Sequence, residues 1–200
     1  MAANAILITL FLSFNVIMAD ETGMGKRPVE FFAEQITLAV DDSAARIECE
    51  FHFRNNLSGQ RNFPVIFPFY VDSQSLFPDY IDACIAGPDR RQLEVKILPE
   101  RNAAVINIPL AESTTIWRLQ YRQRITGSMA RYILTSTQAW GRPLEKATYR
   151  FIVPKSFGEI VVWPQADSTA DTGEFIEYWA HRNNFMPERD MEIRWAKKQF

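Results

Sequence analysis

The chain has 200 residues, of which 47% are hydrophobic and 13% aromatic, and its net charge is -2. These values are typical of a globular protein with a sizeable core and exclude an intrinsically disordered chain. A net charge so close to zero gives no reason to expect nucleic acid as a partner.

The first nineteen residues are typical of a secretory signal peptide. No charged residue occurs between Ala5 and Ala19, and Asp20 and Glu21 follow directly. This apolar stretch is short for a bilayer span but suits a signal peptide, although its start lacks Lys and Arg. We therefore expect residues 1–19 to be removed and the mature chain to be periplasmic or extracellular, with no further membrane span. The alternatives are an uncleaved segment that tethers the chain and a buried strand.

After a short polar linker, residues 20–29, hydrophobic residues recur with a period of two, which is typical of half-buried β-strands. Turn-forming residues separate the runs. Residues 174–181 fit either a strand or one or two helical turns. We predict that residues 30–200 form one domain, an all-β, antiparallel, immunoglobulin-like β-sandwich of about ten strands, with a β-barrel as the alternative. The main runs are 34–40, 45–53, 92–98, 103–110, 115–125, 130–137, 146–154 and 159–164.

Residues 115–125 alternate clearly between an apolar face and a basic face. We expect Trp117, Leu119 and Tyr121 to be buried. The opposite face carries three arginines, which are Arg118, Arg122 and Arg124. They belong to a basic region, because residues 115–155 contain eight basic side chains and one acidic one. Cross-strand pairing with acidic strands explains this charge, and an anion-binding stripe is the functional alternative.

The two cysteines, Cys49 and Cys84, raise the question of a disulfide, since exported proteins often contain them. Strand parity argues against assuming one. Cys49 shares a face with Ile47 and Phe51, whereas Cys84 shares a face with Asp82. A bridge remains one interpretation, and a free buried Cys49 is the other.

Trp140 is the tryptophan best placed to bind a ligand. It precedes a turn that contains Gly141 and Pro143. An exposed indole there would stack on a sugar ring, and together with the arginine stripe it would form a carbohydrate- or anion-binding module. The alternative is that Trp140 closes one end of the sandwich.

The sequence contains few residues in patterns typical of a catalytic or metal site. The two histidines, His52 and His181, have no spacing typical of a metal site or a catalytic triad. The carboxylates Glu48 and Glu50 fit a solvated strand face better than a catalytic pair. The sequence contains no glycine-rich phosphate loop. We therefore predict a protein without a catalytic site, a metal or a cofactor. A deep pocket that holds these carboxylates or histidines would reopen the enzyme alternative.

Residues 179–195, a few residues before the end of the given sequence, contain the last predicted strand. Met191, Ile193 and Trp195 share one face, which we expect to be buried, and Pro187 fits the loop before the strand.

Three stretches resemble small exported bacterial β-sandwich domains of unknown function. They are ITLAVDDSAARIECEFHFRNN, LQYRQRITGSMARYILTSTQAWGRPLEKATYRFIVP and NNFMPERDMEIRW. The resemblance implies a periplasmic or cell-surface location and this architecture, and it implies no catalytic residues. Together these observations favour a non-catalytic exported domain that binds another envelope or secreted protein through an edge strand or end loops.

Overall fold

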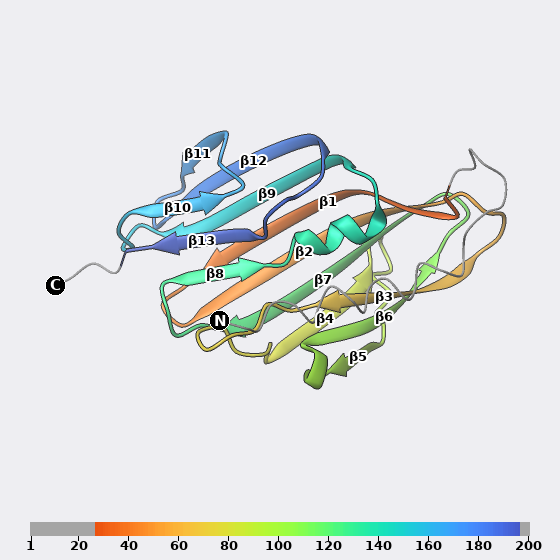
Figure 1. Cartoon of the computed structure of the whole chain (residues 1–200), viewed down its shortest axis with the longest axis horizontal. Helices are drawn as coiled ribbons and strands as arrows, with labels where there is room; N and C mark the ends of the chain where they lie inside the picture. The colour runs from red at the N-terminus through yellow and green to blue at the C-terminus, as the bar shows by residue number, and fades with distance from the viewer. Residues whose placement is uncertain (1–26, 197–200) are drawn as a thin grey trace.

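The computed structural model describes residues 27–196 and confirms an all-β sandwich. Its thirteen strands form three open sheets, so the β-barrel alternative is wrong (Figure 1). The predicted signal peptide, 1–19, and most of the linker predicted at 20–29 lie outside the described residues. The first strand begins at Val29, so the last residue of that linker belongs to a strand.

One layer of the sandwich is a seven-stranded sheet. Its strands, in spatial order, are β11 (Ser168–Asp171), β12 (Phe175–Phe185), β9 (Leu144–Pro154), β1 (Val29–Val40), β2 (Ala44–Asn55), β7 (Thr114–Arg124) and β4 (Tyr80–Ile85). Five of its strand pairs are antiparallel. The prediction of an antiparallel sheet is wrong at one pair, because β1 and β9 are parallel. The chain crosses through the second layer before it returns beside β1, as a parallel pair requires.

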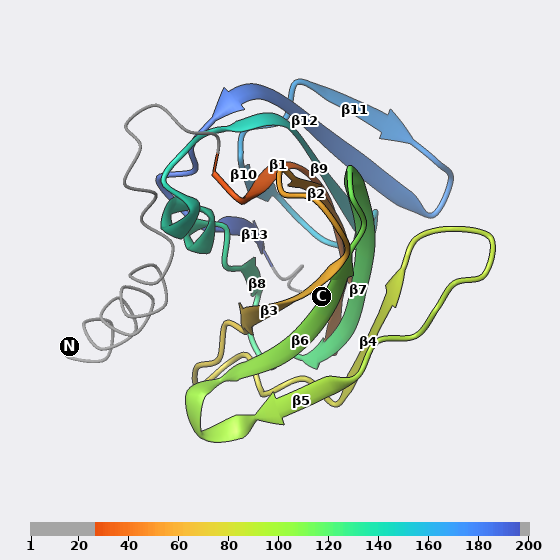
Figure 2. The ribbon, with the colours of Figure 1, turned by 90° about the vertical axis from the view of Figure 1, so that its right-hand side faces the viewer.

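The other layer consists of two three-stranded sheets that cover one face of the large sheet (Figure 2). One sheet contains β10 (Ile160–Trp163), β13 (Met191–Trp195) and β8 (Met129–Tyr132), and the other contains β3 (Arg61–Pro68), β6 (Ala103–Leu110) and β5 (Val95–Leu98). Two short 3-10 helices follow β5 and β8, and they are η2 (Pro99–Arg101) and η3 (Thr135–Trp140). Within residues 27–196, no helix has the length and apolar character needed to cross a bilayer.

The prolines of β3 help to explain why the second layer is divided. The N–H of Phe69 donates to the carbonyl of Asn102 at 2.7 Å. In this register, the backbone N–H and C=O groups of the odd-numbered residues of β3 point toward β6. Pro64 and Pro68 therefore lie on the free edge of β3. Proline has no N–H to donate, and a strand tolerates it best at such an edge. This edge offers few donors to another strand.

The core lies between the two layers and confirms the predicted parity of several strands. Trp117 is 1% exposed, and the closing strand buries Met191 and Ile193 completely. Glu192 faces outward but is only 8% exposed, because Arg131 and Arg194 both contact its carboxylate. Other expectations needed adjustment. The strand predicted at 92–98 is confined to β5, and the ambiguous segment 174–181 is a strand from residue 175 onward, as part of β12.

Candidate binding face

The outer face of the seven-stranded sheet is the face turned away from the second layer (Figure 2). Strand β7 alternates along its length between buried and more accessible residues. Its three predicted arginines, Arg118, Arg122 and Arg124, are exposed on the outer face. The predicted alternation of residues 115–125 is therefore confirmed.

The register between β2 and β7 decides which side chains meet on the outer face. The N–H of Ile125 donates to the carbonyl of Ser43 at 2.8 Å, so odd-numbered residues of β2 form the hydrogen-bonded pairs. Even-numbered residues form the other pairs, in which facing side chains are closest, with Cα atoms roughly 4.5 Å apart. These close pairs include Arg46 with Arg122, Glu48 with Gln120 and Glu50 with Arg118.

Glu50 neutralises Arg118, the first arginine of the predicted stripe. The Nε and Nη2 atoms of Arg118 lie 2.8 and 2.7 Å from one carboxylate oxygen of Glu50. The Nε2 atom of His52 lies 3.0 Å from the other oxygen. Opposite charges in a directly facing pair stabilise a sheet. The pairing explanation of the basic region therefore holds at Arg118.

A hollow of about 390 Å³ lies over this part of the outer face. Asp82 forms one wall, where it accepts hydrogen bonds from Gln120 at 3.0 Å, from Arg90 at 3.4 Å and from Gln92. The charges of Asp82 and Glu50 therefore have fixed partners. Three further lining side chains make no hydrogen bond or ion pair within residues 27–196, namely Gln35, Thr37 and Glu48.

The two cysteines are buried free thiols in the structure. Cys49 pairs with Leu119 and packs in the core, whereas Cys84 pairs with Arg118, and both residues border the hollow. They lie on opposite faces of the sheet, on strands separated by β7, which is a distance of about two strand spacings or ~9.5 Å. A disulfide needs Cβ atoms roughly 3.8 Å apart. The Cys49–Cys84 bridge is therefore absent, as the parity argument indicated.

The remainder of the arginine stripe has a different environment. Arg122 faces Arg46 directly across the strands, and its contact with Asp79 is long, at 3.7 Å. Arg124 forms no ion pair within residues 27–196. Arg46 was missing from the sequence-predicted site. Its sequence neighbours give no signal for it, because only the register places it opposite Arg122.

Trp140 lies at the end of η3, away from the arginine stripe. Its ring packs against Phe31 and Phe53, with ring centroids 5.7 and 5.2 Å apart in edge-to-face geometry. These phenylalanines face the core, so the sheet separates Trp140 from the outer face. Trp140 therefore closes one end of the sandwich. The combination of Trp140 with the arginine stripe does not form.

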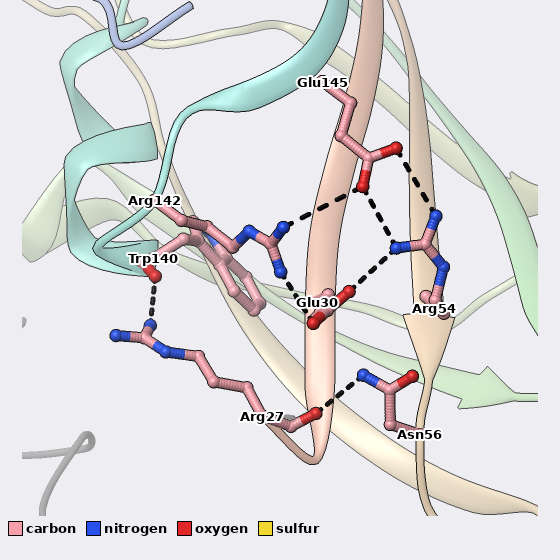
Figure 3. A network of polar contacts seen from close by, with 7 residues as sticks. All are labelled: Arg27, Glu30, Arg54, Asn56, Trp140, Arg142 and Glu145. Atoms are coloured by element: carbon pink, nitrogen blue, oxygen red, sulfur yellow. Dashed lines mark hydrogen bonds and ion pairs between the residues drawn. The ribbon is translucent and has the colours of Figure 1, made fainter. Parts of the chain in front are cut away.

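A charged network surrounds Trp140 and ties the same end of the sandwich together (Figure 3). The carboxylate of Glu30 is 6% exposed and lies between Arg54 and Arg142, at 2.9 and 2.6 Å. Glu145 lies 3.1 Å from Arg54. The guanidinium of Arg27 donates to the carbonyl of Trp140. Because every charge in the network has a partner within it, we interpret it as structural.

Trp179 is an aromatic residue of the outer face that sequence reasoning did not select. The guanidinium of Arg150 lies 4.9 Å from the centre of the Trp179 ring and also pairs with Glu177. His181 lies beside Trp179 with its ring nearly parallel, at 14°. The sequence left this segment ambiguous between helix and strand, which hid the shared face of these residues.

Glu34 is a buried carboxyl group that was also missed. It is 2% exposed and accepts a hydrogen bond of 2.7 Å from the hydroxyl of Tyr149. Burial raises the pKa of Glu34 to about 7, against the opposing effect of this hydrogen bond. Burial also raises the pKa of the Cys49 thiol and the Tyr132 hydroxyl. This titratable cluster belongs to the core, and Cys49 is its one member that also borders the hollow.

The predicted catalytic alternatives lie apart from this cluster. Glu48 and Glu50 line the hollow, whereas His181 lies on β12 beside Trp179. Among residues 27–196, no group of three or more His, Cys, Asp or Glu side chains is arranged to hold a metal ion.

Comparison with models of known protein families and with curated proteins finds no match for the chain.

Proposed function

We propose that this protein is an exported, non-catalytic domain that binds another protein of the cell envelope or the secreted space. The observation that carries the proposal is the outer face. Seven hydrogen-bonded strands present it, and the described second layer covers only the opposite face. A rigid sheet holds side chains in fixed positions, which suits recognition of a partner.

The β4 edge of this face is the part best suited to protein contact. β4 is the last strand of the sheet, and Tyr80 at its start is 52% exposed. Residues 91–93 already bond to Ala83 and Ile85, so the unpaired backbone groups of this edge lie at the start of β4. Unpaired edge groups are available to a partner, and tyrosine and arginine are enriched at protein interfaces. Tyr80 pairs directly with Arg122, so both residue types occur side by side here.

Site-specific crosslinking in the producing cells tests the proposal. A photoreactive amino acid at position 80 should give one discrete protein adduct. The matched control is position 107, because Asn107 is exposed on the second layer. Adducts of equal yield at both positions, or none at position 80, would refute a binding role for this edge.

The exported location is tested separately by the intact mass of the mature protein. A signal peptide at residues 1–19 requires a first residue at or within a few positions of Asp20. A full-length mass in the cell-free or periplasmic fraction would contradict cleavage. The resemblance to exported bacterial sandwich domains supports this part of the proposal.

The alternatives draw less support from the structure. A carbohydrate module built on Trp140 needs an exposed indole, whereas this ring packs into the end of the core. A catalytic acid or base has a shifted pKa and reaches the substrate from a pocket. The carboxyl group with a raised pKa here, Glu34, is buried in the core. Anion binding keeps one specific observation in its favour, which is the pair of arginines 46 and 122.

A further inference from the structure

The facing pair of Arg46 and Arg122 is unfavourable for the fold by itself. Like charges directly opposite in a sheet are destabilising, and this pair is of the type in which side chains are closest. Asp79 is 3.7 Å from Arg122, and both side chains are well exposed, so solvent screens the contact. Asp41 interacts with Arg46 but uses one carboxylate oxygen for the N–H of Ser43. Repulsion between the two arginines is therefore only partly offset.

Arg124 extends the pair along the same strand face. Two residues of a strand span about 7 Å, so the guanidinium groups of Arg122 and Arg124 can reach one extended ligand together. Arg118 is four residues from Arg122, which is about 13 Å, and Glu50 already neutralises it. The basic charge that lacks strong internal pairing is thus concentrated at one end of β7.

Exposed apolar side chains adjoin these arginines. Tyr80 pairs with Arg122 across β4 and β7. The N–H of Leu76 donates to the carbonyl of Arg124 at 3.0 Å, and Leu76 is 40% exposed. We name Arg46, Arg122, Arg124, Tyr80 and Leu76 the arginine patch. Its mixture of arginine, an aromatic ring and an aliphatic chain is typical of protein interfaces.

The composition of the patch favours an acidic polypeptide over a phosphate group. Phosphate sites usually surround the anion with backbone N–H groups at a helix end or a glycine-rich loop. The patch instead lies on an open sheet face, where side chains alone supply the charge. Its tyrosine and leucine add apolar surface that a bare phosphate cannot use.

We propose that the arginine patch is the docking surface for an acidic segment of a partner protein. Carboxylates of the segment would lie between Arg46 and Arg122 and relieve their repulsion, and its apolar side chains would contact Tyr80 and Leu76. Guanidinium groups bind carboxylates through paired hydrogen bonds, which supplies direction as well as charge. The inference rests on the protein-binding role proposed above and assigns that role a surface and a partner chemistry.

The test uses the mature chain and a fluorescent peptide of glutamates interrupted by leucine, with binding followed by fluorescence anisotropy. The double variant Arg46→Gln/Arg122→Gln should weaken binding by about tenfold, since hydrogen bonds to charged groups contribute strongly. The matched control is Arg90→Gln/Arg118→Gln, which removes the same charge from the same face. Arg118 is about 13 Å from Arg122, beyond the screening length of ~8 Å at physiological ionic strength, and Arg90 and Arg118 are already paired with Asp82 and Glu50. The effect of this control should therefore stay below about twofold.

Equal losses in the two double variants would overturn the proposal, because net charge alone would then explain binding. Displacement of the peptide by inorganic pyrophosphate at lower concentration than by the unlabelled peptide would also overturn it in favour of a phosphate site. A peptide with glutamine in place of glutamate must not bind, and equal binding of that peptide contradicts the role of charge.

The variant Arg46→Glu separates folding from binding. It places opposite charges in the facing pair, so its melting temperature should rise while peptide binding is lost. Retained binding would refute the proposal. The failures of the two proposals are also distinguishable. A crosslink at position 80 without peptide binding leaves the protein-binding role in place and removes only the acidic-segment inference.

Discussion

Replacement of Glu34 by glutamine should change how stability depends on pH. The carboxyl group of Glu34 is 2% exposed, and burial raises its pKa from 4.5 to about 7. Below pH 4.5 the folded and unfolded chains both hold the proton. As the pH rises toward 7, the unfolded chain releases it while the folded chain keeps it, so the wild type loses stability in this window. Above about pH 7 both states are ionised and the loss is complete.

The size of the loss follows from the pKa difference. Each pKa unit corresponds to about 1.4 kcal/mol, so a rise from 4.5 to about 7 amounts to about 3 kcal/mol of unfolding free energy. Glutamine keeps an oxygen that accepts the hydrogen bond from Tyr149 and carries no titrating proton. The amide N–H groups of the glutamine have no acceptor in this pairing, and this lowers the unfolding free energy by the same amount at every pH. The change with pH, and not the absolute stability, is therefore the informative quantity.

Urea unfolding of the wild type and of Glu34→Gln at pH 4 and pH 8 measures this change. The free energy of the variant relative to the wild type should rise by about 3 kcal/mol between the two pH values. Glu48→Gln is the matched control, because Glu48 is exposed on the outer face, and its relative stability should stay nearly constant. A difference that stays flat for Glu34→Gln would show that the carboxyl group is not desolvated as described.

Three further predictions concern the fold. Trp140→Ala should lower the unfolding free energy in urea titrations by about 2–3 kcal/mol, which is less than for a fully buried tryptophan, and it should leave peptide binding unchanged. A loss below about 0.5 kcal/mol would contradict the role of Trp140 at the end of the core. Deletion of residues 185–195 removes β13 from the middle of its sheet and should abolish cooperative melting, whereas a soluble truncation with a sharp transition would show that the closing strand is dispensable. Alkylation of the unfolded, unreduced chain should label both Cys49 and Cys84, and a mass 2 Da lower without labelling would reveal the bridge that the structure lacks.

The sequence predicted the parts of the fold that depend on local alternation. Trp117 and Leu119 are buried and the arginines between and beyond them are exposed, because one strand of eleven residues has its register fixed by a buried face. The same argument placed Cys49 inside and Cys84 outside. Strands β3 and β11 lie outside every predicted run, which helps to explain why thirteen strands form where about ten were expected.

The candidate site depends on pairing between distant strands, which a single sequence does not specify. Arg46 became a site residue only because β2 pairs with β7 in a register that sets it opposite Arg122. Arg118 left the site for the same reason, since that register sets it opposite Glu50. For Trp140, the adjoining turn suggested exposure, whereas three phenylalanines from separate strands enclose the ring.

The parallel pairing of β1 with β9 also affects when the molecule can fold. The contact between Glu34 and Tyr149 joins residues 115 positions apart, so the centre of the large sheet cannot close until most of the chain is available. Folds dominated by such distant pairings form slowly. For a chain that is exported as we propose, β1 and β2 can pair early, whereas the large sheet cannot be completed before β9 has emerged from the translocation channel.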